Sequence, residues 1–414
     1  MGRLGLLIVL LANLMAAGVR AAEGEWTRFR GPDGGGISTA ATVPVKWIEK
    51  DCNWRVKVPG VGHSSPVAWG DKIFLTSGDP ETAKRMVLCL AAADGRILWQ
   101  RDYPSKTYEQ NDDNSYASAT PAVDSGGVYV TWTVPKEVTL LALDHAGNQK
   151  WRRDLGPHVA EHGSGTSPIA HEGLVVLASD HDGKSFIVAA DSKTGETRWQ
   201  VPRRSGMASY ATPCVARPAG GLPELVFASG INGLTAVDPA SGKVNWELDE
   251  FGNNRCVGSP VFAEGLVLVS YGYGEPGCRF VAVRPPSKQK GAKAEVAYEY
   301  TKTVPLVVTP LAKDGRVFLW ADDGHVTCLS AAGGKVVWRE KVGGKFFGSP
   351  VWVAGRLYCI SKNGEVFVLA AADKFELLAR IPLGEPSFAT PAIAGGVMYL
   401  RTASHLMSLG GKKM

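Results

Sequence analysis

The chain has 414 residues, a formal net charge of +5, 45% hydrophobic residues and 21% charged residues. This composition excludes a disordered or highly charged tail-type protein. The weak positive charge, without any run of Lys and Arg, gives no reason to expect nucleic acid as the partner. The 49 glycines are about 12% of the 414 residues, compared with a usual share of about 7%. This excess indicates many turns and therefore many short strands.

Residues 1–21 predict a signal peptide for export. Arg3 precedes an apolar stretch from Leu4 to Ala17, and Val19-Arg20-Ala21 has the small residues of a cleavage site. The stretch is short for a membrane span, although an uncleaved anchor stays open as the alternative. The first cysteine is Cys52, so no lipid anchor is expected. We expect a periplasmic or secreted protein with no integral membrane span after signal removal, and the choice between the two compartments is left open.

Residues 22–52 are expected to form an extended N-terminal segment, and residues 53–410 a repeat domain. A Ser/Thr-Pro dipeptide recurs along this domain at intervals of 40 to 55 residues. Its eight prolines are Pro66, Pro121, Pro168, Pro213, Pro260, Pro310, Pro350 and Pro391. A period of this length is typical of propeller blades.

Each full repeat predicts four short strands. In the first repeat they are expected near Val67-Ala68, Ile73 to Leu75, Val87 to Leu90 and Trp99. Four antiparallel strands per repeat make a propeller blade, and radial stacking covers each face of a blade with its neighbour. Two segments interrupt the pattern: a polar loop at 105–114 and a linker at 285–291.

An aromatic residue on the fourth strand is predicted to pack between blades. It stands four residues after a turn glycine, as Trp99 stands after Gly95. The tryptophans at this position are Trp99, Trp151, Trp199, Trp246 and Trp338, and Tyr298 and Leu378 are the expected replacements in the fifth and seventh repeats.

The last repeat is incomplete in the sequence. It predicts only three strands, near Ala392-Ile393, Val397 to Leu400 and His405 to Leu409. The segment from Asn53 to Val58 has the pattern of a fourth strand and would complete it, leaving no open edge. We therefore predict an all-β fold, an eight-bladed β-propeller of four-stranded antiparallel blades closed by an N-terminal strand. We also expect the protein to be a monomer.

The seven cysteines do not form a recognisable disulfide framework. Their number is odd, and the sequence has no CxxC and no adjacent pair. Cys89 and Cys328 each stand ten residues before a tryptophan, where other repeats carry Leu141, Ala189 and Ala236. We predict that they are small core residues. Whether any cysteines pair is left open.

These motifs resemble the pyrroloquinoline-quinone-like (PQQ-like) propeller repeats. The resemblance rests on the Ser/Thr-Pro openings, the Gly…Trp turns and third strands such as Leu141-Ala142-Leu143-Asp144. The segment from Trp26 to Pro32, followed later by His63-Ser64-Ser65-Pro66, is similar to exported bacterial members of this family. The resemblance covers roughly residues 53–410.

The resemblance implies one of two functional branches. BamB-like members are binding scaffolds, whereas quinoprotein dehydrogenases would carry PQQ, Ca²⁺ and a catalytic carboxylate. Quinoprotein alcohol dehydrogenases have a vicinal disulfide, and here no two cysteines are adjacent. We therefore expect an exported scaffold that binds a protein or peptide partner, in envelope or outer-membrane protein assembly. The alternative is a PQQ-dependent dehydrogenase that oxidises alcohols or sugars.

No catalytic, cofactor-binding or metal-binding residue is assigned, but a candidate binding face can be named. The loops before the Ser/Thr-Pro dipeptides join consecutive blades, so they gather around one mouth of the central channel. Such a funnel is suited to an anionic small molecule or a peptide. The alternative for each residue is a solvated rim position or a loop anchor. The candidates are His63, Asn114, Tyr116, His162, Ser164, Arg203, Arg204, Tyr210, Asn254, Arg255, Lys345 and Phe347.

Overall fold

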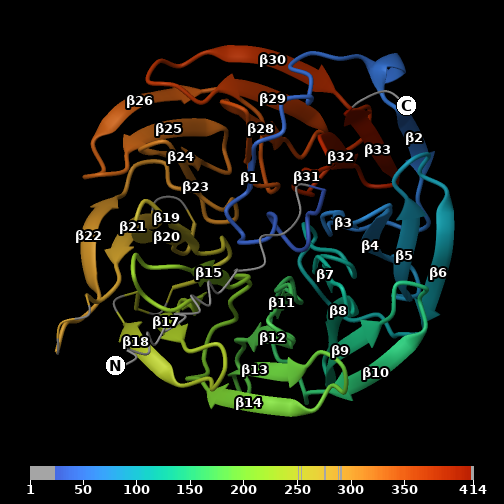
Figure 1. The fold of residues 1–414 in the computed structure, drawn as a ribbon, viewed down its shortest axis with the longest axis horizontal. Coiled ribbons are helices and arrows are strands. Elements are labelled where there is room, and N and C mark those ends of the chain that lie inside the picture. Colours follow the sequence, from blue (N-terminus) through green and yellow to red (C-terminus); the bar gives the residue numbers. More distant parts are fainter. Residues whose placement is uncertain are drawn as a thin grey trace, which may run out of the picture.

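Eight four-stranded antiparallel sheets stand around a central axis and form a ring (Figure 1). The computed structural model describes residues 24–249, 251–252, 254–274, 277–287, 289 and 291–411. In each blade the strands follow one another from the inside of the ring to the outside. The predicted eight-bladed, all-β propeller is confirmed. The predicted signal peptide at 1–21 lies outside the described residues.

Every blade begins one residue after its Ser/Thr-Pro proline. The strands of blades 1 to 4 are β3 (Val67–Trp69), β4 (Lys72–Gly78), β5 (Arg85–Ala91), β6 (Ile97–Tyr103), β7 (Ala122–Asp124), β8 (Gly127–Val134), β9 (Glu137–Leu143), β10 (Gln149–Asp154), β11 (Ile169–His171), β12 (Leu174–Ser179), β13 (Phe186–Asp191), β14 (Thr197–Pro202), β15 (Cys214–Ala216), β16 (Glu224–Ser229), β17 (Gly233–Val237) and β18 (Val244–Leu248). Those of blades 5 to 8 are β19 (Val261–Ala263), β20 (Leu266–Tyr271), β21 (Arg279–Arg284), β22 (Glu295–Tyr300), β23 (Leu311–Lys313), β24 (Arg316–Trp320), β25 (His325–Ser330), β26 (Val336–Lys341), β27 (Val351–Val353), β28 (Arg356–Ile360), β29 (Glu365–Ala370), β30 (Leu377–Pro382), β31 (Ala392–Ala394), β32 (Val397–Arg401), β33 (His405–Gly410) and β2 (Trp54–Lys57).

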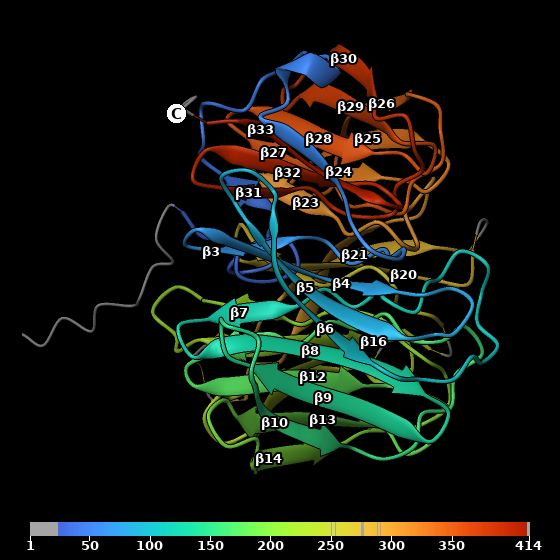
Figure 2. The ribbon, with the colours of Figure 1, turned by 90° about the vertical axis from the view of Figure 1, so that its right-hand side faces the viewer.

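The N-terminal strand closes the ring, as predicted. β2 pairs antiparallel with β33, with Trp54 opposite Ser408 and Lys57 opposite His405. The last blade therefore has three strands from the C-terminal end and one from the N-terminal part of the chain, and β33 keeps no unpaired edge. Figure 2 shows the ring from the side, with the sheets of neighbouring blades stacked face against face.

A closed ring of eight hydrogen bonds joins the blades at their inner ends. The residue before each proline is a buried Ser or Thr. Its backbone N–H donates to the side-chain hydroxyl of the equivalent residue in the next blade, at 2.9–3.3 Å. In order, the ring runs through Ser65, Thr120, Ser167, Thr212, Ser259, Thr309, Ser349 and Thr390, and Thr390 donates back to Ser65. We call this set the hydroxyl ring.

The core lies between the blades rather than inside any one of them. The second and third strands of a blade are buried on both faces, as in β4 and β5, which explains their nearly continuous apolar sequences. The outer strands instead alternate, and β10 buries Trp151 between exposed neighbours. Full burial of each such Val or Leu contributes about 1.5–3 kcal/mol, so the interfaces between blades supply most of the hydrophobic stabilisation.

The fourth-strand tryptophans pack against the next blade, as predicted. The indole N–H of Trp54 donates to the carbonyl of Ala92 at 2.9 Å, and Trp99, Trp151, Trp199 and Trp338 make the same bond one blade further on. A Cβ at Gly95 would lie 2.7 Å from the Trp54 ring, and its φ is +73°. Glycine is required at this turn because the indole of the preceding blade lies against it.

Two details of the expected pattern are corrected. The residue paired with Trp151 is Ala142, not Leu141, because the connection between the third and fourth strands is one residue shorter in blade 2 than in blade 1, where Trp99 pairs with Cys89. In blade 7 the residue opposite Val368 is Ala379, so Leu378 does not occupy the tryptophan position. Tyr298 does occupy it in blade 5, opposite Ala282, and packs on Gly334 of blade 6.

All seven cysteines lie among the described residues, and none of them forms a disulfide bond. Six of them are buried, and Cys52 is half-buried. Cys89 pairs across the ladder with Trp99, where only a small side chain leaves room for the indole. Burial raises the pKa of Cys214 and of Cys256 to about 12, so both remain thiols at neutral pH. The six buried cysteines are core residues, as predicted for Cys89 and Cys328.

The segment from Trp26 to Gly36 lies across the channel and closes it at the end opposite the loops between blades. We call this segment the plug. In Figure 1 this dark-blue segment runs through the middle of the ring. Its buried Arg30 donates to the carbonyls of Pro310 (3.0 Å) and Pro350 (2.6 Å). Arg28 donates to the carbonyl of Pro213. The plug therefore binds three inner strands from inside.

Strand β1 (Ile37–Ser38) continues the plug as a fifth strand of blade 7, parallel to β27. A short 3-10 helix (Glu49–Asp51) then leads into β2. The part predicted as an extended N-terminal segment is thus packed into the ring over much of its length. None of the described helical segments is long and apolar enough to cross a membrane.

Loss of one hydroxyl from the ring should destabilise the whole propeller. We expect Thr390→Val, which keeps the side-chain shape, to lower the free energy of unfolding by about 1–3 kcal/mol, because the buried N–H of Ser349 loses its acceptor. Thr390→Ser keeps the acceptor and should cost less. Urea unfolding of the two variants measures the difference, and equal stabilities would contradict a role for the hydroxyl.

Deletion of residues 24–58 should abolish cooperative thermal unfolding and cause aggregation, because β33 would be left as an open edge. Deletion of residues 24–36 alone removes the plug but retains β2. That control should still unfold cooperatively, at a lower temperature. Calorimetry with light scattering distinguishes these outcomes, and an unchanged melting curve for the longer deletion would contradict closure by β2.

Candidate functional site

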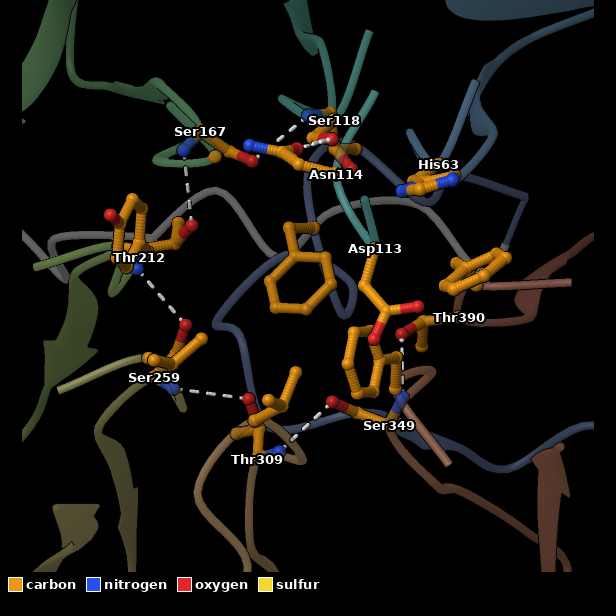
Figure 3. A pocket seen from close by; sticks show the side chains of 18 of the residues that line it. His63, Asp113, Asn114, Ser118, Ser167, Thr212, Ser259, Thr309, Ser349 and Thr390 are labelled. Carbon is orange, nitrogen blue, oxygen red and sulfur yellow. Dashed lines mark hydrogen bonds between the residues drawn. The ribbon is translucent and has the colours of Figure 1, made fainter. Parts of the chain in front are cut away.

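A cavity of about 380 Å³ lies inside the hydroxyl ring. All eight ring residues line it, and Phe29 of the plug lies at its closed side. The other lining residues come from the loops between blades and from nearby strand ends: His63, Asn111, Asp113, Asn114, Ser118, His162, Gly165, Tyr210, Arg255, Val257, Leu306, Val307, Phe347 and Phe388. Figure 3 shows the part of the hydroxyl ring that runs from Ser167 through Thr212, Ser259, Thr309 and Ser349 to Thr390. The cavity opens on the loop side because the plug closes the other.

Six of the twelve candidate residues line this cavity. They are His63, Asn114, His162, Tyr210, Arg255 and Phe347. They come from six different inter-blade loops, which the ring brings together around one mouth. Propeller topology therefore indicates this mouth, since the residue two positions before each Ser or Thr of the hydroxyl ring lines the cavity.

The other six candidates lie away from the cavity. Tyr116 packs under Arg85, and Arg203 forms a buried ion pair with Asp180 at 2.7 Å. Arg204 is exposed and pairs with Asp249. The remaining three have local roles or face solvent: Ser164 accepts a bond from Asn114 through its carbonyl, Asn254 donates to the carbonyl of Phe251, and Lys345 is exposed. Sequence position alone did not separate residues that face the channel from residues that face the adjoining blade.

One wall of the cavity is aromatic. The His63 ring stacks on Phe388 with centroids 4.1 Å apart, and Phe347 meets Phe388 edge-on at 5.7 Å. Burial, with the Arg401 guanidinium as the second cause, lowers the pKa of His63 to about 4. His63 is therefore a neutral, planar part of this wall at pH 7.

Beside the aromatic wall, the loop at 104–120 extends over the cavity and carries Asp113 into it (Figure 3). The Asp113 carboxylate pairs with Lys362, which belongs to the β28–β29 hairpin of blade 7. The Lys362 ammonium lies 4.6 Å from the ring centroid of Phe347 and 5.4 Å from that of Phe388. A loop that follows blade 1 is thus connected across the mouth to blade 7.

On another side of the mouth, Arg255 is the central group. Its guanidinium donates to the imidazole of His162 and, at 2.7 Å, to the carboxylate of Glu161. It also lies 5.3 Å from the ring centroid of Tyr273. Arg255 is only 19% exposed, whereas Glu161 is 71% exposed. The cation is held within the wall, and its carboxylate partner lies in solvent.

A buried carboxylate supports a third part of the wall. Asp322 accepts backbone N–H bonds from Leu306 (3.0 Å), Val307 (3.2 Å) and Val308 (3.3 Å). Burial raises the pKa of Asp322 to about 6, even though these bonds favour its charged form. Asp322 fixes the loop whose Leu306 and Val307 line the cavity.

Four residues at this site are not among the candidates predicted from the sequence: Asp113, Lys362, Phe388 and Phe29. Asp113 belongs to a loop recognised as polar, but nothing in the loop indicates a partner 249 residues away. Lys362 lies in a hairpin turn, where lysine is ordinary. The two residues meet only because ring closure places blade 7 near the loop that follows blade 1.

The lining residues do not fit PQQ with Ca²⁺. Calcium takes six to eight oxygen ligands, several of them carboxylates. Asp113 is the one carboxylate among the described lining residues, and Lys362 already pairs with it. The described part of the chain has no group of three or more His, Cys, Asp or Glu side chains placed to hold a metal ion.

Comparisons with known proteins place this architecture. A family model described as outer membrane protein assembly factor BamB matches residues 51–205, 83–305 and 301–404. The BamB protein of Yersinia pestis is 20% identical over 355 residues, covering 84% of this chain and 75% of that protein. The structure of BamB from Moraxella catarrhalis aligns with a TM-score of 0.62 at 15% identity, over 87% of this chain and 96% of that one.

The fold is similar to that of a quinoprotein to a comparable degree. Quinohemoprotein alcohol dehydrogenase from Comamonas testosteroni aligns with a TM-score of 0.61 at 13% identity, over 94% of this chain and 81% of that one. At these identities the structural likeness shows a shared fold and nothing about activity. The chemistry has to be argued from the cavity itself.

The lowered pKa of His63 predicts a pH dependence of stability. A base whose pKa is depressed by folding stabilises the protein above its ordinary pKa of about 6.5 and loses that contribution as pH falls toward its folded pKa of about 4. We expect the unfolding free energy of the wild type to fall between pH 7 and pH 4 by about 2 kcal/mol more than that of His63→Gln. Urea unfolding at both values measures this, and NMR titration of the imidazole near pH 6.5 would contradict it.

Proposed function

Because this chain belongs to the BamB-like family of PQQ-like repeat propellers, we propose that it is an exported scaffold that binds an extended segment of a partner protein. The binding place is the mouth of the channel described above. The family match, which spans most of the chain, supports a scaffold. The cavity supports the place, because it is the point where the loops of several blades present side chains to one space.

The shape of the cavity favours a chain segment as the occupant. A volume of about 380 Å³ accommodates a few side chains, but not a folded domain. The plug closes the far side, so a segment would enter and leave by the same mouth. Tyr273, which is 63% exposed, lies beside Arg255 and extends the contact area beyond the cavity. Val159, which is 51% exposed, belongs to the same inter-blade loop as His162.

The chemistry of the lining also favours binding over catalysis. The hydroxyls of the ring accept hydrogen bonds from neighbouring backbone N–H groups. A hydroxyl that acts as a nucleophile needs an adjacent base to take its proton, and a backbone N–H group is not a base. His63 is a neutral imidazole at pH 7 and stacks on Phe388, and the imidazole of His162 accepts from Arg255. Aromatic rings and paired charges at a mouth are features of recognition sites.

The relatives are named as outer membrane protein assembly factors, and we propose this context for the present chain. In that role it would act in the periplasm as a monomeric ring and hold a segment of an outer-membrane protein or of another assembly factor. The N-terminal sequence Arg3 to Ala21, with its features of an export signal, agrees with such a location.

Two experiments test the proposal. In the organism that makes this protein, deletion of its gene should reduce the amount of folded outer-membrane β-barrel proteins about two-fold or more, as measured by mass spectrometry of the outer-membrane fraction. A photo-crosslinking residue in place of Tyr273 should capture a defined polypeptide in vivo. The same residue in place of Leu222, which is 78% exposed in the β15–β16 hairpin at the far end of its blade, should not.

Unchanged outer-membrane proteins together with equal capture from both positions would overturn the scaffold proposal. The dehydrogenase alternative has its own readout. Retention of quinone absorbance through desalting after addition of PQQ and Ca²⁺, with dye-linked oxidation of an alcohol or sugar, would replace the scaffold by an enzyme.

A further inference from the structure

The mouth of the cavity holds two cations that are more buried than the carboxylates paired with them. The side chains of Lys362 and Arg255 are 21% and 19% exposed. Their partners, Asp113 and Glu161, are 41% and 71% exposed, and both belong to loops between blades. The cations therefore belong to the wall, whereas the carboxylates reach them from the solvent side.

The two cations are held by groups other than their carboxylates. Lys362 lies against the rings of Phe347 and Phe388. Arg255 lies against the ring of Tyr273, and its backbone pairs with Gly272 in an isolated bridge. Each cation would keep its position if its carboxylate moved away, because aromatic rings hold cations without a counter-charge. Ion pairs with such exposed partners contribute about 0–1 kcal/mol, so exchange of the partner costs little stability.

Two further donors at the same mouth have no partner among the described residues. They are the Nε of Arg255 and the hydroxyl of Tyr210, both buried. Tyr210 and Arg255 both line the cavity. An arginine with a free Nε presents the paired N–H groups that bind a carboxylate through two bonds. The site thus has unused capacity for an anionic oxygen group.

We propose that this mouth binds the side-chain carboxylates of an acidic and apolar peptide segment, and that Asp113 and Glu161 occupy the same positions in the free protein. The proposal rests on the scaffold function and names the chemistry of its partner. An aspartate or glutamate of the partner would replace Asp113 at Lys362 or Glu161 at Arg255. The neighbouring apolar side chain would enter between Phe29 and the Phe347–Phe388 wall.

The internal carboxylates then act as competitors for the partner. When a site is partly occupied by its own chain, the apparent dissociation constant rises in inverse proportion to the open fraction. Removing the competitor tightens binding, whereas removing the cation weakens it. The two members of one ion pair therefore have opposite effects on binding, which is not expected of a pair that only stabilises the fold.

The test uses the mature chain and a defined probe, an acetylated and amidated hexapeptide that alternates glutamate with phenylalanine. Its dissociation constant is measured by calorimetry for the wild type and for variants. Asp113→Asn and Glu161→Gln should each tighten binding about three- to ten-fold. Lys362→Gln and Arg255→Gln should each weaken it about ten-fold or more, and Lys362→Arg should retain it.

Controls identify the source of the recognition. The glutamine version of the hexapeptide should not bind, and a glutamine peptide with a free C-terminal carboxylate should not bind either, because the site is assigned to side-chain carboxylates. Arg204→Gln, which removes an exposed ion pair outside the cavity, should leave the dissociation constant unchanged. Melting temperatures of all variants separate loss of binding from loss of folding.

Weaker binding by Asp113→Asn, in parallel with Lys362→Gln, would show a structural pair and overturn the proposal. Equal binding of the glutamate and glutamine peptides would also overturn it. If neither peptide binds while the crosslinker at Tyr273 still captures a polypeptide, the scaffold function stands and the assignment of an acidic partner is wrong. A free-carboxylate peptide that alone binds would move recognition to a chain terminus and likewise overturn the assignment.

Discussion

The rest of the structure depends on the hydroxyl ring. Each Ser or Thr before a blade's proline gives its N–H to the hydroxyl of the next blade and offers its own hydroxyl to the blade before, so one residue type serves both neighbours. The following proline has no N–H, which leaves no competing donor at this narrow radius. Eight such bonds close only when eight blades are present, and the bond from Thr390 to Ser65 completes the circle. Blade number and inner radius are set together.

At larger radius the tryptophan and glycine contacts repeat the connection between blades. Trp54 on β2 packs on Gly95 of blade 1, so the strand that closes the ring also joins the first blade. The plug adds a third connection, because Arg30 binds carbonyls of two inner strands that are 40 residues apart in sequence. With one side of the ring filled in this way, the channel is a cavity with one mouth. Its chemistry is decided by whichever loops reach the open side.

The direction of the chain in each blade explains why one end of the channel is open and lined by loops, whereas the plug closes the other end. Inner strands begin at the mouth and end at the plug, so loops between blades and the hairpins between second and third strands meet at the mouth. Asp113 belongs to a loop between blades, and Lys362 to such a hairpin. The repeat pattern was enough to predict that His63, His162 and Arg255 face a common mouth. It was not enough for Arg203, whose partner Asp180 lies in the adjoining part of its own blade.

The sequence by itself determined the blade count, the strand order and the closing strand, because all three are carried by local periodicity: the Ser/Thr-Pro openings, the glycine turns and the match of Asn53 to Val58 with a fourth strand. Only the tertiary structure decided that the hydroxyls form a ring, that Arg28 and Arg30 fill the channel, and that Lys362 meets Asp113. These contacts join residues up to several hundred positions apart, and no local pattern encodes them. They exist because closing the ring brings distant loops to one axis.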